Sequence, residues 1–276
     1  MSATLIHPSA VIEQGAELGS AVEIGPFCHI GPMVKLADGV KLVSHVSVTG
    51  DTTIGEGTQV QAFAALGGPP QDQKYKGGPT SLVIGKNCDI RESVTMHRGT
   101  EHGGGRTIVG DNGFFLAYSH IAHDCIIGDN VTMTHGATLG GHCELGDGVI
   151  MGGLSAVHQF TRIGHHAFIG GMAAVVGDVI PYGMAVGDRA KLKGFNIIGL
   201  KRAGMSRSDL KAMRTAYRLI FAPGRTVSEN IEAVRADFAD TPVVMDIIDF
   251  LTSRGKRYFT VPALEDRDNA TDDDDD

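Results

Sequence analysis

The segment LGSAVEIGPFCHIGPMVKLADGVKL, residues 18–42, repeats a single six-residue pattern. A large aliphatic residue stands at every sixth position, as at Leu18, Ile24 and Ile30, and a small or β-branched residue often follows it four positions later, as at Val22 and Cys28. The same step extends outward over three runs, from Ile6 to Leu66, from Ile84 to Met96 and, after a shift of phase, from Val109 to Val175. Short strands broken by a turn every six residues can coil, with three strands in each turn of the coil.

This pattern predicts a parallel β-helix, in which equivalent positions of successive coils stack about 4.8 Å apart and the large aliphatic residues fill the interior. The four cysteines all fall on the small inward position of a hexad, so we expect buried structural thiols rather than nucleophiles or metal ligands. They are Cys28, Cys88, Cys125 and Cys143.

The extent of the repeats sets the predicted domains. The β-helix is predicted over residues 1–185, with loops at 67–83 and 97–108, where the hexads are interrupted by stretches rich in glycine. A small α-helical C-terminal domain is predicted over residues 186–257. Residues 258–276 end in a run of aspartates and are predicted to be a disordered acidic tail.

Within the predicted helical domain, three helices are expected. Ser206 and Thr226 each precede an acidic residue at the third following position, which is the signature of a capping box at a helix start. A third helix is expected from Pro242 to Ser253.

The charge distribution points to an acidic partner. The net charge is −8, yet the stretch from Asp188 to Arg225 holds ten basic and only two acidic residues. A basic patch on an acidic protein indicates a specific anionic partner rather than a nucleic acid, although a solvated helix face would carry similar charges. We expect a cytoplasmic protein without membrane insertion, because the chain starts without a signal-peptide pattern and has no apolar stretch of membrane-spanning length.

Histidines provide the candidate chemistry. His123, His142 and His158 occupy nearly equivalent positions of three successive coils and are expected to stack along one edge, with His120 nearby. One interpretation is that His123 acts as a general base on a substrate hydroxyl, with Asp124 orienting its ring and a backbone N–H of the Gly140–Gly141 pair stabilising an oxyanion. The other interpretation is a zinc site built from these histidines.

Five segments carry a resemblance to a known family. They are PQDQKY (70–75), IRESVTMHRGT (90–100), HIAHDC (120–125), VHQF (157–160) and GFNIIGLKRAGMS (194–206). Together they resemble the UDP-N-acetylglucosamine O-acyltransferases, hexapeptide-repeat enzymes of the first step of lipid A biosynthesis. The resemblance covers the chain to about Arg257 and implies that the β-helix is left-handed. The predicted fold is therefore an all-β left-handed parallel β-helix with a small α-helical C-terminal domain.

The resemblance also implies an activity. Members of this family transfer an (R)-3-hydroxyacyl chain from acyl carrier protein to the 3-hydroxyl of UDP-N-acetylglucosamine. The family is homotrimeric, with sites in clefts between neighbouring chains, and uses no cofactor or metal. The acidic carrier protein accounts for the basic patch, and no nucleic acid is implied.

Residue roles follow from the matching positions of the family. His123 is implied to be the general base, Asp124 its orienting carboxylate and Gly141 the oxyanion donor, and Gly171 is implied to limit acyl-chain length. The implied substrate-binding residues are Gln71, Asp72, Lys74, His120, His142, His158, Gln159, Asn196 and Arg202.

Ile198 and Ala203 depart from the family pattern near the implied nucleotide contacts. This leaves a 3-amino UDP-sugar open as the acceptor, in which case the product is an amide. Two other hypotheses are a zinc-dependent, carbonic-anhydrase-like hydratase and a non-catalytic scaffold that binds acyl carrier protein. The sequence does not predict the preferred acyl-chain length.

Overall fold

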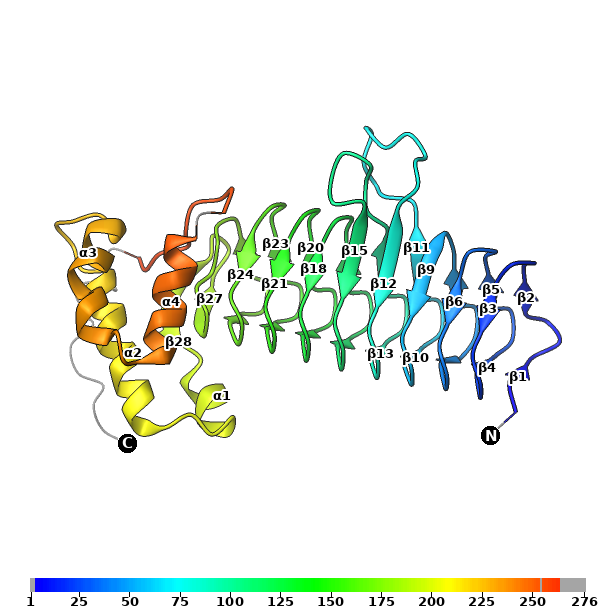
Figure 1. Cartoon of the computed structure of the whole chain (residues 1–276), viewed down its shortest axis with the longest axis horizontal. Helices are drawn as coiled ribbons and strands as arrows, with labels where there is room; N and C mark the ends of the chain where they lie inside the picture. Colours follow the sequence, from blue (N-terminus) through cyan, green and yellow to red (C-terminus); the bar gives the residue numbers. More distant parts are fainter. Residues whose placement is uncertain (1–2, 254, 264–276) are drawn as a thin grey trace.

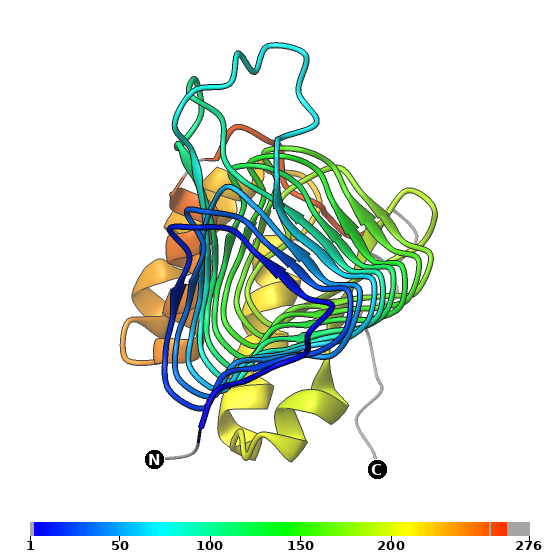
Figure 2. The ribbon, with the colours of Figure 1, turned by 90° about the vertical axis from the view of Figure 1, so that its right-hand side faces the viewer.

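The computed structural model describes residues 3–253 and 255–263, and it shows a prism of coiled strands that carries a cluster of helices at its C-terminal end (Figure 1). Successive strands join three parallel sheets in rotation, so the predicted left-handed parallel β-helix is confirmed (Figure 2). We call the sheets A, B and C, and we name each edge of the prism by the two sheets that it joins.

Sheet A contains β1 (Leu5–Ile6), β4 (Glu23–Ile24), β7 (Lys41–Leu42), β10 (Gln59–Val60), β13 (Asp89–Ile90), β16 (Phe114–Phe115), β19 (Thr132–Met133), β22 (Ile150–Met151), β25 (Phe168–Ile169), β27 (Gly183–Val186) and β28 (Lys191–Phe195). Sheet B contains β2 (Val11–Ile12), β5 (His29–Ile30), β8 (Ser47–Val48), β11 (Ala65–Gly68), β14 (Thr95–His97), β17 (His120–Ile121), β20 (Thr138–Leu139), β23 (Ala156–Val157) and β26 (Ala174–Val175). Sheet C contains β3 (Glu17–Leu18), β6 (Lys35–Leu36), β9 (Asp51–Ile54), β12 (Ser81–Ile84), β15 (Arg106–Val109), β18 (Ile126–Ile127), β21 (Glu144–Leu145) and β24 (Arg162–Ile163).

The core consists of the aliphatic residues that recur in the hexads. From Ile24 to Val175 these side chains are buried, and the four cysteines are buried free thiols, as predicted. The first coil differs, because no coil precedes it to cover this end of the prism: 46% of the surface of Ile6 is exposed, and Ile12 and Leu18 are only partly buried.

Many corners of the prism hold a residue in the left-handed backbone region. At the B–C edge three successive coils place Asp124, His142 and Phe160 there, with φ of 58°, 61° and 65°. Asp and His tolerate this conformation better than most residues, and a corner repeated in every coil requires it. These positive φ values are therefore a property of the coil rather than a mark of function.

Two loops leave the prism at the B–C edge, but they are shorter than predicted. Residues 67–68 belong to β11 and 81–83 to β12, so the first loop covers residues 69–80. The second covers 98–105, because β14 extends to residue 97 and β15 begins at residue 106. The hexad anchor marks only one residue of each strand, whereas β9, β12 and β15 pair over four residues each. Both figures show the loops side by side above the prism (Figures 1 and 2).

The C-terminal region is less helical than predicted. The predicted boundary at residues 185–186 falls inside β27, and β28 pairs with it antiparallel and ends sheet A. The helices that follow are α1 (Ile197–Arg202), α2 (Arg207–Ile220), α3 (Val227–Val234), the 3-10 helix η1 (Arg235–Phe238) and α4 (Pro242–Thr252). The capping interactions of Ser206 and Thr226 are present, whereas α1 was not predicted from the spacing of apolar residues.

Residues 255–263 return from the helices to the prism, and we call them the strap. Phe259 forms a bridge with Asp178, and Pro262 with Leu192. The predicted acidic tail is therefore wrong for residues 258–263, because backbone pairing rather than composition decides their placement; residues 264–276 lie outside the described part. Among the described helices, none combines the length and the hydrophobicity needed to cross a membrane.

Candidate active site

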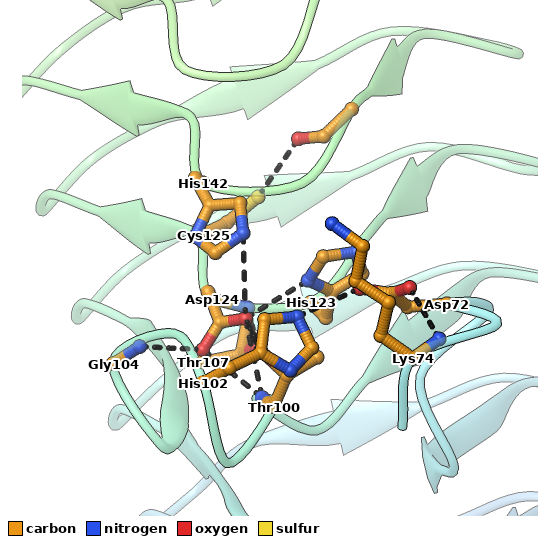
Figure 3. A network of polar contacts seen from close by, with 11 residues as sticks. Asp72, Lys74, Thr100, His102, Gly104, Thr107, His123, Asp124, Cys125 and His142 are labelled. Atoms are coloured by element: carbon orange, nitrogen blue, oxygen red, sulfur yellow. Dashed lines mark hydrogen bonds and ion pairs between the residues drawn. The ribbon is translucent and has the colours of Figure 1, made fainter. Parts of the chain in front are cut away.

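The candidate base lies at the B–C edge beneath the two loops. His123 follows β17 and contacts Asp124 through Nδ1, 2.9 Å from Oδ2 (Figure 3). His142 follows β20 on the next coil, with its Nε2 3.8 Å from the same carboxylate oxygen. The side chain of His123 is 12% exposed and that of Asp124 only 1%, so the pair is largely shielded from water but still reachable.

Asp124 is held by the second loop. Its carboxylate accepts hydrogen bonds from Thr100 N, from Thr100 Oγ1 at 2.6 Å and from Gly104 N at 2.9 Å. Burial alone would raise the pKa of Asp124, but the hydrogen bonds from Thr100 and His123 outweigh it and lower the pKa below its usual value. The carboxylate thus remains ionised, keeps the proton of His123 on Nδ1 and leaves Nε2 available to accept one.

An aromatic stack continues from His123 along the edge. The rings of His123 and His142 meet edge to face with centroids 5.1 Å apart, and His142 lies parallel to Phe160 at 4.3 Å. Burial lowers the pKa of His142 although Asp124 acts in the opposite direction, so this ring is neutral near pH 7. Phe160 was not among the predicted site residues, but its position 18 residues after His142 could have indicated it.

His158 does not join this stack, so the predicted row of three histidines is wrong. Its Nδ1 lies 2.7 Å from Nη2 of Arg257, and it is exposed. The reason is the corner geometry: His142 and Phe160 hold the left-handed position of successive corners and stack face to face, whereas His158 lies two residues before Phe160. The side chain of Gln159 is exposed beside His158.

Gly141 packs directly against the candidate base. A Cβ atom at this position would lie 2.5 Å from Cε1 of His123. The neighbouring amides of Gly140 and His142 donate to Val157 O and His123 O, whereas the N–H of Gly141 donates to no group in the described part of the chain. Gly141 therefore offers a free N–H immediately beside the ring.

The first loop brings two of its three predicted residues to this edge. Asp72 accepts hydrogen bonds from Nε2 of His102 at 3.0 Å and from Lys74 N at 2.9 Å, and Figure 3 shows Asp72 and Lys74 with the polar network around Asp124. Gln71 is exposed in the same loop. Glu101 accepts hydrogen bonds from Lys76 N and Gly78 N, so the second loop supports the first.

His120, on β17 just before His123, belongs to a second polar group that extends one coil upstream to β14. Its Nδ1 lies 2.7 Å from Thr95 Oγ1, and its ring meets that of His97 at 5.1 Å. Burial lowers the pKa of His120 and lowers that of His97 to about 4, so both rings are neutral near pH 7. Sequence reasoning missed His97 and Thr95 as site residues, although both stand in the segment 90–100 that carries the resemblance.

Three predicted residues lie away from the B–C edge. Asn196 caps α1, where its side chain accepts a hydrogen bond from Gly199 N, and Arg202 ends the same helix. Helix α1 lies on the opposite side of the prism from the two loops (Figures 1 and 2). Gly171 lies at the A–B edge, between β25 and β26. A single chain does not bring these residues to His123.

Ligand atoms of His123, Asp124 and His142 lie within 4.8 Å of one another, a spacing that three ligands of one metal ion would have. The donor set fits poorly, however. The carboxylate of Asp124 already accepts hydrogen bonds from Thr100, Gly104 and His123, so a cation would have to displace at least one of these donors. This network favours the acid–base interpretation over a zinc site.

Comparison with known proteins gives consistent matches. A family model described as UDP-N-acetylglucosamine O-acyltransferase, domain 2, matches residues 178–259, and one described as bacterial transferase hexapeptide matches 106–141. An acyl-[acyl-carrier-protein]–UDP-N-acetylglucosamine O-acyltransferase of Mesorhizobium japonicum is 62% identical, covering 99% of this chain and 98% of its own. The Bartonella henselae protein of the same name is 51% identical over 96% and 97%.

Solved structures agree with these relatives. The LpxA structure from Acinetobacter baumannii has a TM-score of 0.90 and 40% identity, over 93% of this chain and 99% of that one. The UDP-N-acetylglucosamine acyltransferase of Francisella novicida has a TM-score of 0.92 and 32% identity, over 99% and 100%. The chain belongs to the UDP-N-acetylglucosamine O-acyltransferase family.

Proposed function

We propose that this enzyme transfers an (R)-3-hydroxyacyl chain from acyl carrier protein to the 3-hydroxyl of UDP-N-acetylglucosamine, the first step of lipid A biosynthesis. The main observation in support of acyl transfer is the His123–Asp124 pair. Nε2 of His123 is free and lies beside the free N–H of Gly141. Relatives named O-acyltransferases over the whole chain support a hydroxyl acceptor over the 3-amino alternative, and an enzyme over a scaffold.

In this mechanism His123 Nε2 removes the proton of the sugar hydroxyl while its oxygen attacks the thioester carbonyl carbon. The carbonyl oxygen becomes an oxyanion that accepts a hydrogen bond from Gly141 N–H. The carbon–sulfur bond then breaks, the thiolate of the carrier leaves, and the proton on His123 passes to it. Asp124 remains ionised throughout and stabilises the imidazolium.

The other predicted residues are proposed to bind the substrates around this centre. His142 and His120, both kept neutral by burial, would hydrogen-bond the sugar nucleotide without adding charge. Asp72, Lys74 and Gln71 would hold the glucosamine ring and acyl group from the first loop. His158 and Gln159 would extend the contacts downstream along the edge.

We further propose that a neighbouring chain completes the site in a homotrimer. Two observations support this: Asn196, Arg202 and Gly171 lie far from the B–C edge of their own chain, and the A–B edge carries an apolar ridge. Its exposed members are Phe27, Phe63, Tyr118, Leu154 and Met172. An exposed apolar patch of this extent is typical of a protein interface. In a trimer, Asn196 and Arg202 would contact the nucleotide, and Gly171 would limit the acyl chain.

Acyl carrier protein is the proposed acidic partner of the basic stretch around α2, where Lys211 and Arg214 are exposed. A cytoplasmic location is proposed from the four buried free thiols, which suit a reducing compartment.

The test of the catalytic assignment is His123→Ala. We expect the transfer rate to fall about 10²–10⁴-fold, the usual contribution of a positioned base, while the circular dichroism spectrum and binding of acyl carrier protein stay unchanged. His166→Ala, exposed at the C–A edge and away from both the candidate site and the apolar ridge, is the matched control and should retain full activity. Unchanged turnover in His123→Ala would defeat the assignment.

Substrate identity is tested separately with wild-type enzyme. A series of hydroxyacyl carrier proteins of increasing chain length is offered with UDP-N-acetylglucosamine or its 3-amino analogue. An ester product formed at the higher kcat/KM supports the proposed acceptor, and preferential amide formation contradicts it.

A further inference from the structure

A cavity lies at the downstream end of the B–C edge, beyond the His123–Asp124 pair. It has a volume of about 580 Å³ and lies between the strap and the last coils of the prism. Its polar lining residues include His158, Arg189, Lys191 and Arg257, and its apolar ones Val176, Ala190, Tyr258 and Phe259. A concave, partly apolar site with a few convergent polar groups is typical of small-ligand binding.

The cavity has an excess of positive charge. Within the described part of the chain, Arg189, Lys191 and Arg257 form no salt bridge with a carboxylate, although the protein as a whole has a net charge of −8. Lys256, the next residue of the strap, adds another positive charge close by, with its Nζ 4.3 Å from the centroid of the Phe160 ring. Cations gathered around a cavity without counter-charges attract an anionic ligand.

Arg257 also sets the hydrogen-bonding state of His158. Its Nη2 lies 2.7 Å from Nδ1 of His158, and its Nε donates to Gln159 O at 2.9 Å. Nδ1 also lies 3.2 Å from Gln159 O, but that carbonyl oxygen already accepts the shorter hydrogen bond from Arg257 Nε. A guanidinium group only donates, so in the 2.7 Å contact Nδ1 accepts and the neutral ring carries its proton on Nε2. His158 therefore presents an N–H donor, which suits an anionic or carbonyl oxygen.

The cavity lies on the same edge of the prism as the catalytic pair, because its lining residue His158 follows β23 at the B–C edge. Phe160, beside which Lys256 lies, stacks on His142, and His142 contacts His123. His123 and His158 belong to coils two steps apart, which corresponds to about 10 Å along the axis at the usual strand spacing. A substrate that extends downstream from His123 would reach the cationic cavity with its charged end.

We propose that this cavity, formed by Arg189, Lys191, Arg257 and His158, binds a phosphate group carried by a substrate. The phosphate belongs either to the diphosphate of the sugar nucleotide or to the phosphodiester of the pantetheine arm on acyl carrier protein. The arginines suit it because guanidinium groups form charge-assisted, bidentate hydrogen bonds with phosphate oxygens. This proposal rests on the proposed function and assigns a phosphate-binding role to the strap.

The experiment compares Lys191→Gln and Arg257→Gln with Lys86→Gln, which removes the same charge from an exposed site on the C–A edge. Lys191 has no described side-chain partner, so its substitution should leave the fold intact. Binding of UDP and of 4′-phosphopantetheine is measured by calorimetry, and KM and kcat are measured for each substrate. We expect the Kd of one probe and the KM of the matching substrate to rise about tenfold, with kcat nearly unchanged. Arg257→Lys should restore part of the loss.

Comparison of the two probes, UDP and 4′-phosphopantetheine, identifies the source of the phosphate. A change confined to UDP and UDP-N-acetylglucosamine assigns the cavity to the diphosphate, and one confined to phosphopantetheine and the acyl carrier protein assigns it to the phosphodiester. If neither Lys191→Gln nor Arg257→Gln differs from Lys86→Gln, the proposal is overturned. If the wild type transfers no acyl chain, the proposed function fails, while the calorimetry still decides whether the cavity binds a phosphate.

Discussion

Gly141 has no side chain, and this leaves room for the ring of the candidate base, His123. In Gly141→Ala the new Cβ would meet His123 Cε1 at 2.5 Å, so the ring must move. We expect kcat to fall about 10²-fold, as for other misplacements near 1 Å, with little change in thermal stability. Gly31→Ala at an equivalent corner is the control, because its Cβ would approach nothing closer than 3.4 Å. Normal kcat in Gly141→Ala would show that the ring position is not critical.

His97 makes stability depend on pH. Burial lowers its pKa from 6.5 to about 4 in the folded protein, so the unfolded chain binds the proton more tightly. The contribution to stability is therefore complete above pH 6.5 and is lost as the pH falls toward 4. His97→Gln should reduce the loss of unfolding free energy between about pH 7 and about pH 4.5, measured by urea denaturation. Equal losses in both proteins would contradict the buried neutral histidine.

At the scale of elements, the two loops and the strap act together on one edge of the prism. Each loop follows a strand of sheet B and precedes one of sheet C, and the coil returns each such connection to the same edge. The second loop holds Asp124 through Thr100 and supports the first loop through Glu101. The loops therefore bring residues separated by about 50 positions in the sequence to one small region.

This arrangement predicts the effect of Glu101→Ala. The variant leaves Lys76 N and Gly78 N without their acceptor, which should loosen residues 69–80 but not the prism. We expect faster proteolysis in this loop and a KM for the sugar nucleotide raised about three- to tenfold, since a hydrogen bond to a charged group contributes about 1.5–3 kcal/mol and part of it is regained from water. Glu144→Ala, on an exposed strand of sheet C, is the control. An unchanged cleavage pattern and KM would show that the first loop does not depend on Glu101.

At the scale of the whole molecule, basic residues are concentrated between Asp188 and Arg225, a stretch that contains β28, α1 and α2 at the C-terminal end of the prism. Reversing the charges of Lys211 and Arg214 on α2 should weaken binding of acyl carrier protein, by about tenfold at low ionic strength and less at high salt, where screening shortens the range of the attraction. Titrations at two salt concentrations measure this, with the same reversal at Lys41 and Lys86 as the control. Binding that is independent of salt would contradict an electrostatic docking surface.

Sequence periodicity was sufficient to predict the β-helical prism, because each hexad specifies its own strand and its own buried residue. Ile24, Ile121 and Val175 needed no knowledge of distant residues to be assigned inward, and the cysteines followed from the same phase. The ends of the loops were misjudged where pairing between coils, rather than the local pattern, extended β12 and β15. Strand β28 was missed because it pairs antiparallel with its neighbour β27 beyond the last hexad, where the six-residue pattern no longer marks strands. The strap was missed because its partners, Asp178 and Leu192, are distant in the sequence.

By itself the sequence determined the β-helix, its buried positions and the pairing of His123 with Asp124, because these depend on a local repeat and on adjacent residues. Only the tertiary structure decided which side chains surround that pair. Thr100 reaches it from a loop and Gly141 from the next coil, and Phe160 stacks on the adjacent ring of His142. His158 instead contacts Arg257. The physical reason is that a coil fixes which residues share an edge, but the direction of each side chain at a corner depends on backbone conformation and on neighbours far along the chain.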